Sequence, residues 1–323
     1  MKKILLLILI SWFDYSFGQD GGTLTEVENF GKNPGNLRMY THYKTVNDTG
    51  KVPLVIVLHG CGQDARAVAD LTGWNKLADL NNFVVVYPEQ KMINNASKCF
   101  NWFHEKDIER DKGECESIYQ MIRWAEKKYA IDTNQVFVTG LSAGAAMTAV
   151  MAATHPETFK QGAIFAGGAY KIGTTPVAMT KALFGNRYLP QGTLVKNVKE
   201  QNPNYKGEYP TMIIYQGLND PIVNHKNAGM LVSQWTGLHN ADTVPDQTIH
   251  AFMGVEDITR FEYKDSLGRA VVIYYEANNL GHKLLVHPSN KENEGGKLGV
   301  HGVDKGIHSI YQTAKEFGII KNK

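Results

Sequence analysis

The sequence is poor in cysteine, nearly balanced in charge and, beyond its first residues, free of long apolar runs. Its 323 residues include three cysteines and carry a formal net charge of +2. So small a net charge gives no electrostatic reason to expect nucleic acid or a membrane surface as a partner. The cysteine spacing does not resemble a zinc site. With 43% hydrophobic residues, no internal repeat and no low-complexity segment, the composition is that of an ordinary globular protein.

The first 18 residues have the layout of a secretory signal peptide. Met-Lys-Lys precedes an apolar run at 4–10, and small residues at 16–18 suit a cleavage site. We expect a mature chain of residues 19–323, secreted to the periplasm or the extracellular space, with no membrane contact after cleavage. The alternative is an N-terminal membrane anchor, but the apolar core is too short to span a bilayer comfortably.

Export would place the three cysteines in an oxidising compartment, where one disulfide can form. Cys99 and Cys115 are close in sequence and lie in one polar region. We therefore predict a Cys99–Cys115 disulfide, which leaves Cys61 as a free thiol.

Apolar segments typical of buried strands alternate with segments typical of helices from about residue 52 to the end. The predicted strands cover 53–58, 83–87, 136–138, 161–168, 211–215 and 270–276, after an exposed early strand at 37–43. The predicted helices cover 65–80, 117–129, 226–236 and 306–317. This alternation predicts an α/β fold with a mostly parallel central sheet flanked by helices. Functional groups in such sheets gather at the carboxyl ends of the strands.

Residues 171–209 do not fit this alternation. Glycine, proline and asparagine interrupt the stretch, and only 177–184 has the pattern of a short helix. So long an irregular segment between strands is usually functional or mobile. We interpret it as a cap-like insertion over the strand ends of a single domain. A disordered surface loop is the alternative.

Residues 136–144, Val-Phe-Val-Thr-Gly-Leu-Ser-Ala-Gly, join a predicted strand to a helix through the pattern G-x-S-x-G. The β-branched and aromatic start is typical of a buried strand, and the small and apolar residues of 145–153 favour a helix. In this context the pattern predicts a nucleophile elbow with Ser142 at its turn. The helix N-terminus there favours developing negative charge. A Gly/Ser-rich turn without chemistry is the alternative.

Asp220 and His282 each follow a later predicted strand, so the chain order Ser142, Asp220, His282 is that of the α/β-hydrolase triad. In this interpretation Ser142 attacks an acyl carbon and His282 takes its proton. Asp220 orients the imidazole and stabilises the imidazolium. Other candidates are His287 for the base, and Glu276 and Asp257 for the acid.

The oxyanion of such a reaction needs preorganised hydrogen-bond donors. The Ala143 N–H is one of them by its position after the nucleophile. The loop after the first buried strand supplies the other, and we place it at the Cys61 N–H, with Gly62 as the alternative. We predict Trp102 as a substrate contact, with packing in the core as the alternative.

Six segments together resemble one known family. They are Asn-Pro-Gly-Asn-Leu-Arg-Met-Tyr at 33–40, Leu-His-Gly-Cys-Gly-Gln at 58–63, Tyr-Pro-Glu-Gln at 87–90, Cys-Phe-Asn-Trp-Phe at 99–103, the elbow, and Gly-His at 281–282. This combination resembles the secreted esterases of the polyhydroxybutyrate depolymerase family, which is related to feruloyl and acetylxylan esterases. The resemblance covers nearly the whole mature chain. It implies the α/β-hydrolase fold, the triad above, Cys61 as an oxyanion contributor, and neither metal nor cofactor.

The chain departs from that family at two places. The family often continues Gly-His with Ala-Trp-Pro-Gly-Gly, whereas Lys-Leu-Leu-Val-His follows here at 283–287. A tryptophan there would offer a flat apolar contact to the substrate, so its absence leaves the substrate open. The family also often has Gly-Glu-Pro where this chain has Gly-Glu-Cys at 113–115. The second change fits the predicted Cys99–Cys115 disulfide.

We predict a secreted serine esterase that hydrolyses carboxylic esters through an acyl-enzyme. The sequence shows no added binding module and linker of the kind used on solid polymer, so hydroxyalkanoate oligomers or other short-chain esters are favoured. A feruloyl or acetylxylan esterase acting on plant polysaccharide is the alternative. Two further classes on the same fold are an acyltransferase and a non-catalytic binding protein. The presence of serine, aspartate and histidine argues against the last.

Overall fold

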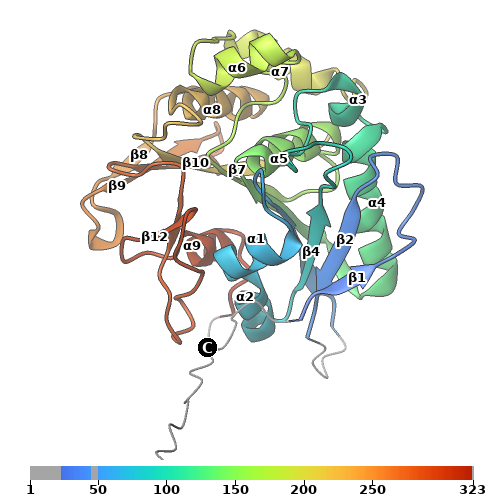
Figure 1. Cartoon of the computed structure of the whole chain (residues 1–323). Coiled ribbons are helices and arrows are strands. Elements are labelled where there is room, and N and C mark those ends of the chain that lie inside the picture. The colour runs from blue at the N-terminus through green and yellow to red at the C-terminus, as the bar shows by residue number, and fades with distance from the viewer. Residues whose placement is uncertain (1–22, 45–49, 322–323) are drawn as a thin grey trace, which may run out of the picture.

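The computed structural model describes residues 23–44 and 50–321, and a ten-stranded sheet forms its centre (Figure 1). The strand order is β1-β2-β4-β3-β5-β6-β7-β10-β9-β8. The strands of this sheet are β1 (Thr25–Val27), β2 (Arg38–His42), β3 (Val52–Leu58), β4 (Val84–Glu89), β5 (Ile131–Leu141), β6 (Gln161–Phe165), β7 (Thr211–Gly217), β8 (Gln247–Ile249), β9 (Ile258–Lys264) and β10 (Ala270–Ala277). The predicted signal peptide lies outside the described residues.

The middle of the sheet is parallel and its edges are antiparallel. Strands β4, β3, β5, β6, β7 and β10 pair in parallel, while β1 and β2 on one side and β9 and β8 on the other run antiparallel to their neighbours. Parallel strands covered on both faces carry near-continuous apolar runs, as Leu54 to Leu58 does in β3. The predicted mostly parallel sheet is confirmed.

Helices cover both faces of the sheet (Figure 1). They are α1 (Ala65–Thr72), α2 (Trp74–Asn81), α3 (Glu105–Ile108), α4 (Gly113–Lys128), α5 (Ala143–Thr154), α6 (Pro176–Leu183), α7 (Gln191–Lys199), α8 (Lys226–Leu238) and α9 (Ser309–Glu316). The buried side chains of α4, α5 and α8 join one core cluster, and those of α1, α2 and α9 join the cluster on the other face.

The single helix predicted over 65–80 is wrong, because the structure has two. Gly73 separates α1 from α2 with a φ of 73°, in the left-handed region that glycine adopts most readily. A Cβ atom there would also lie 2.9 Å from the backbone nitrogen of Gly296. The glycine therefore both turns the chain and lets a C-terminal segment approach closely.

The stretch 171–209 holds two helices, α6 and α7, of which the sequence predicted only the first. Helix α7 packs against α8 and buries Leu194 and Val198 in the core cluster on that face. Figure 1 shows α6 and α7 together at the edge of the molecule beside α8. A role for this stretch as a cap stays a prediction.

Strands at the periphery escaped the sequence patterns. The seven-residue β9 was missed, and so were three strands of three residues each: β8 at the sheet edge, and β11 (Leu284–Val286) and β12 (Gly302–Asp304), which form a separate two-stranded sheet. Segments of three residues carry too little periodicity to be recognised. Within the described residues, no helix combines the length and the apolar character that crossing a membrane requires.

Candidate active site

Ser142 lies at a sharp turn between β5 and α5, where it is the N-cap residue of the helix. Its φ of 57° and ψ of −119° are unusual for a non-glycine residue and cost about 1–3 kcal/mol, which the surrounding structure must offset. A Cβ atom on Gly140 would lie 2.4 Å from the Gly144 carbonyl, and one on Gly144 would lie 2.3 Å from the Leu58 oxygen. Both glycines are thus required for the helix to start so close to the strands.

Asp220 and His282 form a hydrogen-bonded pair beyond the ends of β7 and β10. The distance from His282 Nδ1 to Asp220 Oδ2 is 2.7 Å, and the Asp220 side chain is fully buried. The other oxygen, Oδ1, accepts hydrogen bonds from the N–H groups of Ile222 and Val223, each at 2.8 Å. Burial alone would raise the pKa of Asp220. The hydrogen bond and charge of His282, with the two N–H groups, lower it below the usual aspartate value.

Backbone contacts hold the loops of this pair together. The Leu218 N–H donates to the Ala277 carbonyl at 3.0 Å, and the Asn219 N–H donates to the Leu280 carbonyl at 3.1 Å. A Cβ atom on Gly217 would lie 2.3 Å from that same Leu280 oxygen, so glycine permits the close approach. The positions of Asp220 and His282 are therefore fixed mainly by the backbone.

The other candidates for base and acid have partners elsewhere. The His287 Nδ1 lies 2.8 Å from Asp304, on the two-stranded sheet. Asp257 pairs with Lys305 at 2.6 Å, and Glu276 accepts a hydrogen bond at 3.1 Å from the hydroxyl of the tyrosine two positions before it. The structure thus brings Asp220 and His282 together and leaves these alternatives outside the pair.

The loop after β3 lies against the elbow. A Cβ atom on Gly60 would lie 3.5 Å from Ser142 Cβ. The Gly62 N–H donates to the Ser97 carbonyl at 2.8 Å and is therefore engaged. Cys61 precedes it, and the Ala143 N–H, at the first position of α5, is one of the groups that a helix leaves without an internal partner. This geometry favours Cys61 over Gly62 as a second donor near Ser142.

The predicted Cys99–Cys115 disulfide is wrong. Cys99 instead pairs with Cys61, across a sequence separation of 38 residues. Cys115 is a free thiol, fully buried in α4. Nearness along the chain misled the prediction, because the fold brings the loop after β4 back against the loop after β3.

A buried carboxyl group supports the same two loops. Glu114 accepts hydrogen bonds from the Asn101 N–H at 2.8 Å, from Asn101 Nδ2 at 2.7 Å and from Gln90 Nε2. Gln90 in turn donates its N–H to His59 Nε2 at 3.0 Å, while the His59 Nδ1 lies 2.7 Å from the Gly60 oxygen. Burial raises the pKa of Glu114 to about 8 and lowers that of His59 to about 4.

Sequence analysis assigned no role to Glu114 or Gln90, although Gln90 lies in a segment that carries the family resemblance and Glu114 adjoins a position where the chain departs from it. Trp102 comes directly after Asn101 in the chain and is 8% exposed. Its ring centroid lies 5.7 Å from that of Phe103. It belongs to the core cluster on the α5 face. Its predicted contact with substrate stays a prediction.

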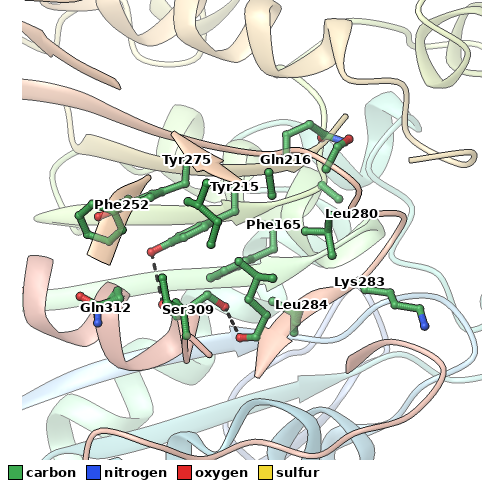
Figure 2. A pocket seen from close by; sticks show the side chains of 16 residues that line it. Phe165, Tyr215, Gln216, Phe252, Tyr275, Leu280, Lys283, Leu284, Ser309 and Gln312 are labelled. Carbon is green, nitrogen blue, oxygen red and sulfur yellow. Dashed lines mark hydrogen bonds between the residues drawn. The ribbon is translucent and has the colours of Figure 1, made fainter. Parts of the chain in front are cut away.

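A cavity with an aromatic wall is lined by residues of β6, β7 and β10 and by residues close to His282 in the sequence (Figure 2). The rings of Phe165, Tyr215 and Tyr275 stack along the wall, with centroids 4.4 and 4.5 Å apart. Leu280 and Lys283 continue the lining into the loop of His282, and the cavity volume is about 20 Å³, room for little more than one water molecule. No member of the predicted triad is among the residues that line it. The cavity therefore includes residues on either side of His282 in the chain, but not the triad itself.

Comparison with known proteins identifies the family. Residues 40–246 match the family model described as Esterase PHB depolymerase. The chain belongs to this family. A PHB depolymerase-type relative, poly(3-hydroxyalkanoate) depolymerase C of Paucimonas lemoignei, is 38% identical over 299 residues, which cover 92% of this chain and 70% of that protein.

Other relatives of this PHB depolymerase-family chain are named for different esters. An acetylxylan esterase of Coprinopsis cinerea is 33% identical over 70% of this chain and 61% of its own length. Feruloyl esterase B of Talaromyces funiculosus is 27% identical over 80% of this chain and 73% of its own length. The predicted family and the predicted esterase activity are confirmed.

A solved structure supports the fold. The acetyl xylan esterase from Aspergillus awamori aligns with a TM-score of 0.78 and 24% identity, over 92% of this chain and the whole of that one. The PHB depolymerase-family chain therefore has the α/β-hydrolase fold, as predicted.

Proposed function

We propose that this esterase acts through a serine nucleophile and an acyl-enzyme, with Ser142, His282 and Asp220 as its triad. The observation that carries the proposal is the 2.7 Å contact between His282 Nδ1 and the buried Asp220 carboxylate. A carboxylate whose pKa is lowered stays ionised at neutral pH and keeps the proton of the imidazole on Nδ1. Nε2 is then free to take the proton of Ser142 Oγ.

The N–H groups of Ala143 and Cys61 bind the oxyanion of the tetrahedral intermediate. The loop of Cys61 lies against Ser142, and the helix N-terminus after Ser142 adds a favourable dipole. One such donor is typically worth about 3 kcal/mol of transition-state stabilisation. Water then attacks the acyl-enzyme, with His282 again as the base, and releases the acid.

The substrates we propose are short-chain esters, including hydroxyalkanoate oligomers, cleaved outside the cell after removal of the signal peptide. Among the relatives described, a poly(3-hydroxyalkanoate) depolymerase has the highest identity, 38% over 299 residues. Acetyl or feruloyl groups on plant polysaccharide are the second candidate, because the relatives at 33% and 27% identity are named for those esters. Trp102 contacts the substrate in either case.

The test of the mechanism compares wild type with Ser142→Ala on p-nitrophenyl butyrate. We expect kcat to fall at least about 10⁴-fold, since the nucleophile is lost. Ser97→Ala, at an exposed serine in the neighbouring loop, is the matched control and should keep wild-type turnover. A fluorophosphonate should label wild type and Ser97→Ala at Ser142. Turnover by Ser142→Ala at the wild-type rate would overturn the mechanism.

The substrate is tested separately, on the same wild-type enzyme. Hydroxybutyrate dimers and trimers, acetylated xylan and methyl ferulate are compared by kcat/KM. We expect the hydroxybutyrate oligomers to have the largest value. A larger value for either of the other two esters would assign the chain to the second candidate function and leave the mechanism intact.

A further inference from the structure

Three potential metal ligands meet at the end of α5 opposite Ser142. One ligand atom each from Asp111, Glu116 and His155 lies within 4.8 Å of the other two. His155 is the C-cap residue of α5, Glu116 lies in the first turn of α4, and Asp111 lies in the connection that precedes α4. The proposed reaction uses none of the three.

The surroundings of His155 fix its tautomer. Its Nδ1 lies 3.0 Å from Thr154 Oγ1 and 3.6 Å from Cys115 Sγ. Thr154 Oγ1 donates its own proton to the Val150 carbonyl at 2.8 Å, so it accepts a hydrogen bond from Nδ1–H. The lone pair of the ring therefore resides on Nε2. Histidines that bind metals typically donate their other ring N–H in this way.

That lone pair has no partner. His155 is 0% exposed, and within the described part of the chain its Nε2 atom is buried without a hydrogen bond. Tyr119 stacks on the ring at 4.2 Å and limits its rotation. A buried acceptor left unpaired costs free energy, which a bound cation would remove.

The charges around the cluster suit a cation. Asp111 and Glu116 bring two carboxylates, and the C-terminal end of α5 adds the negative end of its dipole. Glu116 Oε1 accepts a hydrogen bond from Gln120 at 2.6 Å, which orients its carboxylate. Arg110 is the neighbouring positive charge, and it is already paired with Glu157 at 2.7 Å.

We propose that Asp111, Glu116 and His155 bind one divalent transition-metal ion, with Zn²⁺ as the preferred species. One imidazole nitrogen and two carboxylate oxygens suit zinc, and water can fill a fourth position. Bonds of about 2.0–2.2 Å require the ligand atoms to draw slightly closer than their present spacing, and the exposed side chain of Asp111 has that freedom. Bound there, the ion ties the end of α5 to α4 and so stabilises the helix that begins after Ser142.

The experiment titrates the tag-free mature protein, stripped with EDTA, with Zn²⁺ by isothermal calorimetry. We expect one tight site in wild type, a melting temperature that rises by several degrees with excess Zn²⁺, and visible absorption bands of a histidine- and oxygen-bound ion with Co²⁺. The double variant Asp111→Asn/Glu116→Gln should lose at least about 100-fold in affinity and lose the thermal shift. Both substitutions keep side-chain size, and His155 is left in place so that the core stays intact.

Asp304→Asn is the matched control, because it likewise removes a carboxylate near a histidine, here the more exposed His287. We expect Asp304→Asn to retain the site. Equal zinc affinity and stoichiometry in wild type and the double variant would overturn the proposal, as would loss of the site in Asp304→Asn alone. Esterase turnover of each zinc-free variant checks that the fold is retained, and the metal readouts do not depend on the triad assignment.

Discussion

The two sides of the candidate site are held by different forces. On one side, the loop 59–63 is joined to the loop after β4 by the Cys61–Cys99 disulfide and by the buried network of Glu114. On the other side, backbone hydrogen bonds join the loops of Asp220 and His282. The first side depends on a covalent bond and on buried groups that titrate, so reductant and pH should affect it most. The second side should withstand both.

The largest expected effect comes from the backbone-held side. In Asp220→Asn, the amide oxygen can still accept from the N–H groups of Ile222 and Val223, so the loop keeps its shape. The amide NH₂ then faces His282 and favours the wrong tautomer. We expect kcat for p-nitrophenyl butyrate to fall about 10⁴-fold, with the melting temperature little changed.

Asp257→Asn is the control for this variant, because Asp257 is the aspartate that the sequence left as an alternative and it pairs with Lys305. It should retain wild-type kcat. A larger loss of kcat in Asp257→Asn than in Asp220→Asn would identify Asp257 as the acid of the triad and contradict the assignment of Asp220.

The covalently held side should lose the most stability. Removing the disulfide in Cys61→Ala/Cys99→Ala frees a loop of 38 residues in the unfolded chain, which by the chain-entropy relation lowers the free energy of unfolding by about 4 kcal/mol. Urea unfolding measures this loss, and wild type in dithiothreitol should behave like the double variant. Cys115→Ala, at the free cysteine, should cost only about 1 kcal/mol. An equal loss of unfolding free energy in Cys61→Ala/Cys99→Ala and in Cys115→Ala would contradict a special role of the disulfide.

The sequence predicted the backbone-held side better than the covalently held one, and the reason is physical. Ser142, Asp220 and His282 each follow a strand of a parallel sheet, so strand order alone places them at one edge. The partner of Cys99 depends instead on how two loops fold across each other, which no periodicity encodes.

Local conformation and burial limited the prediction in the same way. Apolar spacing continues through Gly73, so the break between α1 and α2 depends on a left-handed backbone and on the approach of Gly296. From the sequence alone, Glu114 would be predicted to lie at the surface as an ordinary charged residue. Only the folded chain surrounds its carboxyl group with hydrogen-bond donors.

Acid should remove the contribution that His59 makes to the covalently held side. The pKa of His59 is lowered to about 4 by burial, so its neutral form stabilises the folded state above the unfolded value of about 6.5. That contribution is lost as the pH falls from about 6.5 to 4, and it amounts to about 3 kcal/mol of unfolding free energy. The pKa of Asp220 is lowered too, but for a carboxylate this means that its contribution persists to below pH 3.8.

Urea unfolding of wild type and His59→Gln at pH 7, 5.5 and 4.5 checks this expectation. The buried histidines His155 and His308, with pKa values lowered by burial to about 3 and about 4, contribute equally to both proteins. The variant should therefore show a shallower loss of stability with acid. Parallel curves would contradict the assignment of this acid sensitivity to His59.

The smallest expected loss of unfolding free energy concerns Glu114, whose hydrogen bonds support the covalently held side. In Glu114→Gln, the amide NH₂ must face either the Asn101 N–H, at the position of Oε2, or Asn101 Nδ2 and Gln90 Nε2, at the position of Oε1, and all of these donate. A buried donor left unpaired lowers the free energy of unfolding by about 2 kcal/mol at pH 5. Glu105→Gln, at an exposed glutamate in α3, is the control and should be neutral.

The pH dependence of this difference separates the carboxyl group from simple packing. Burial raises the folded pKa of Glu114 to about 8, above its unfolded value, so its contribution is fully present below about pH 4.5 and is lost as the pH rises through 8. Wild type alone loses stability over that interval, since glutamine does not titrate. Since the shift corresponds to about 5 kcal/mol, more than the gap at pH 5, the gap between wild type and Glu114→Gln should close and then reverse from pH 5 to pH 9 in urea unfolding. A constant gap would mean that the carboxyl group is already ionised in the folded protein at pH 5, with its three donors outweighing its burial.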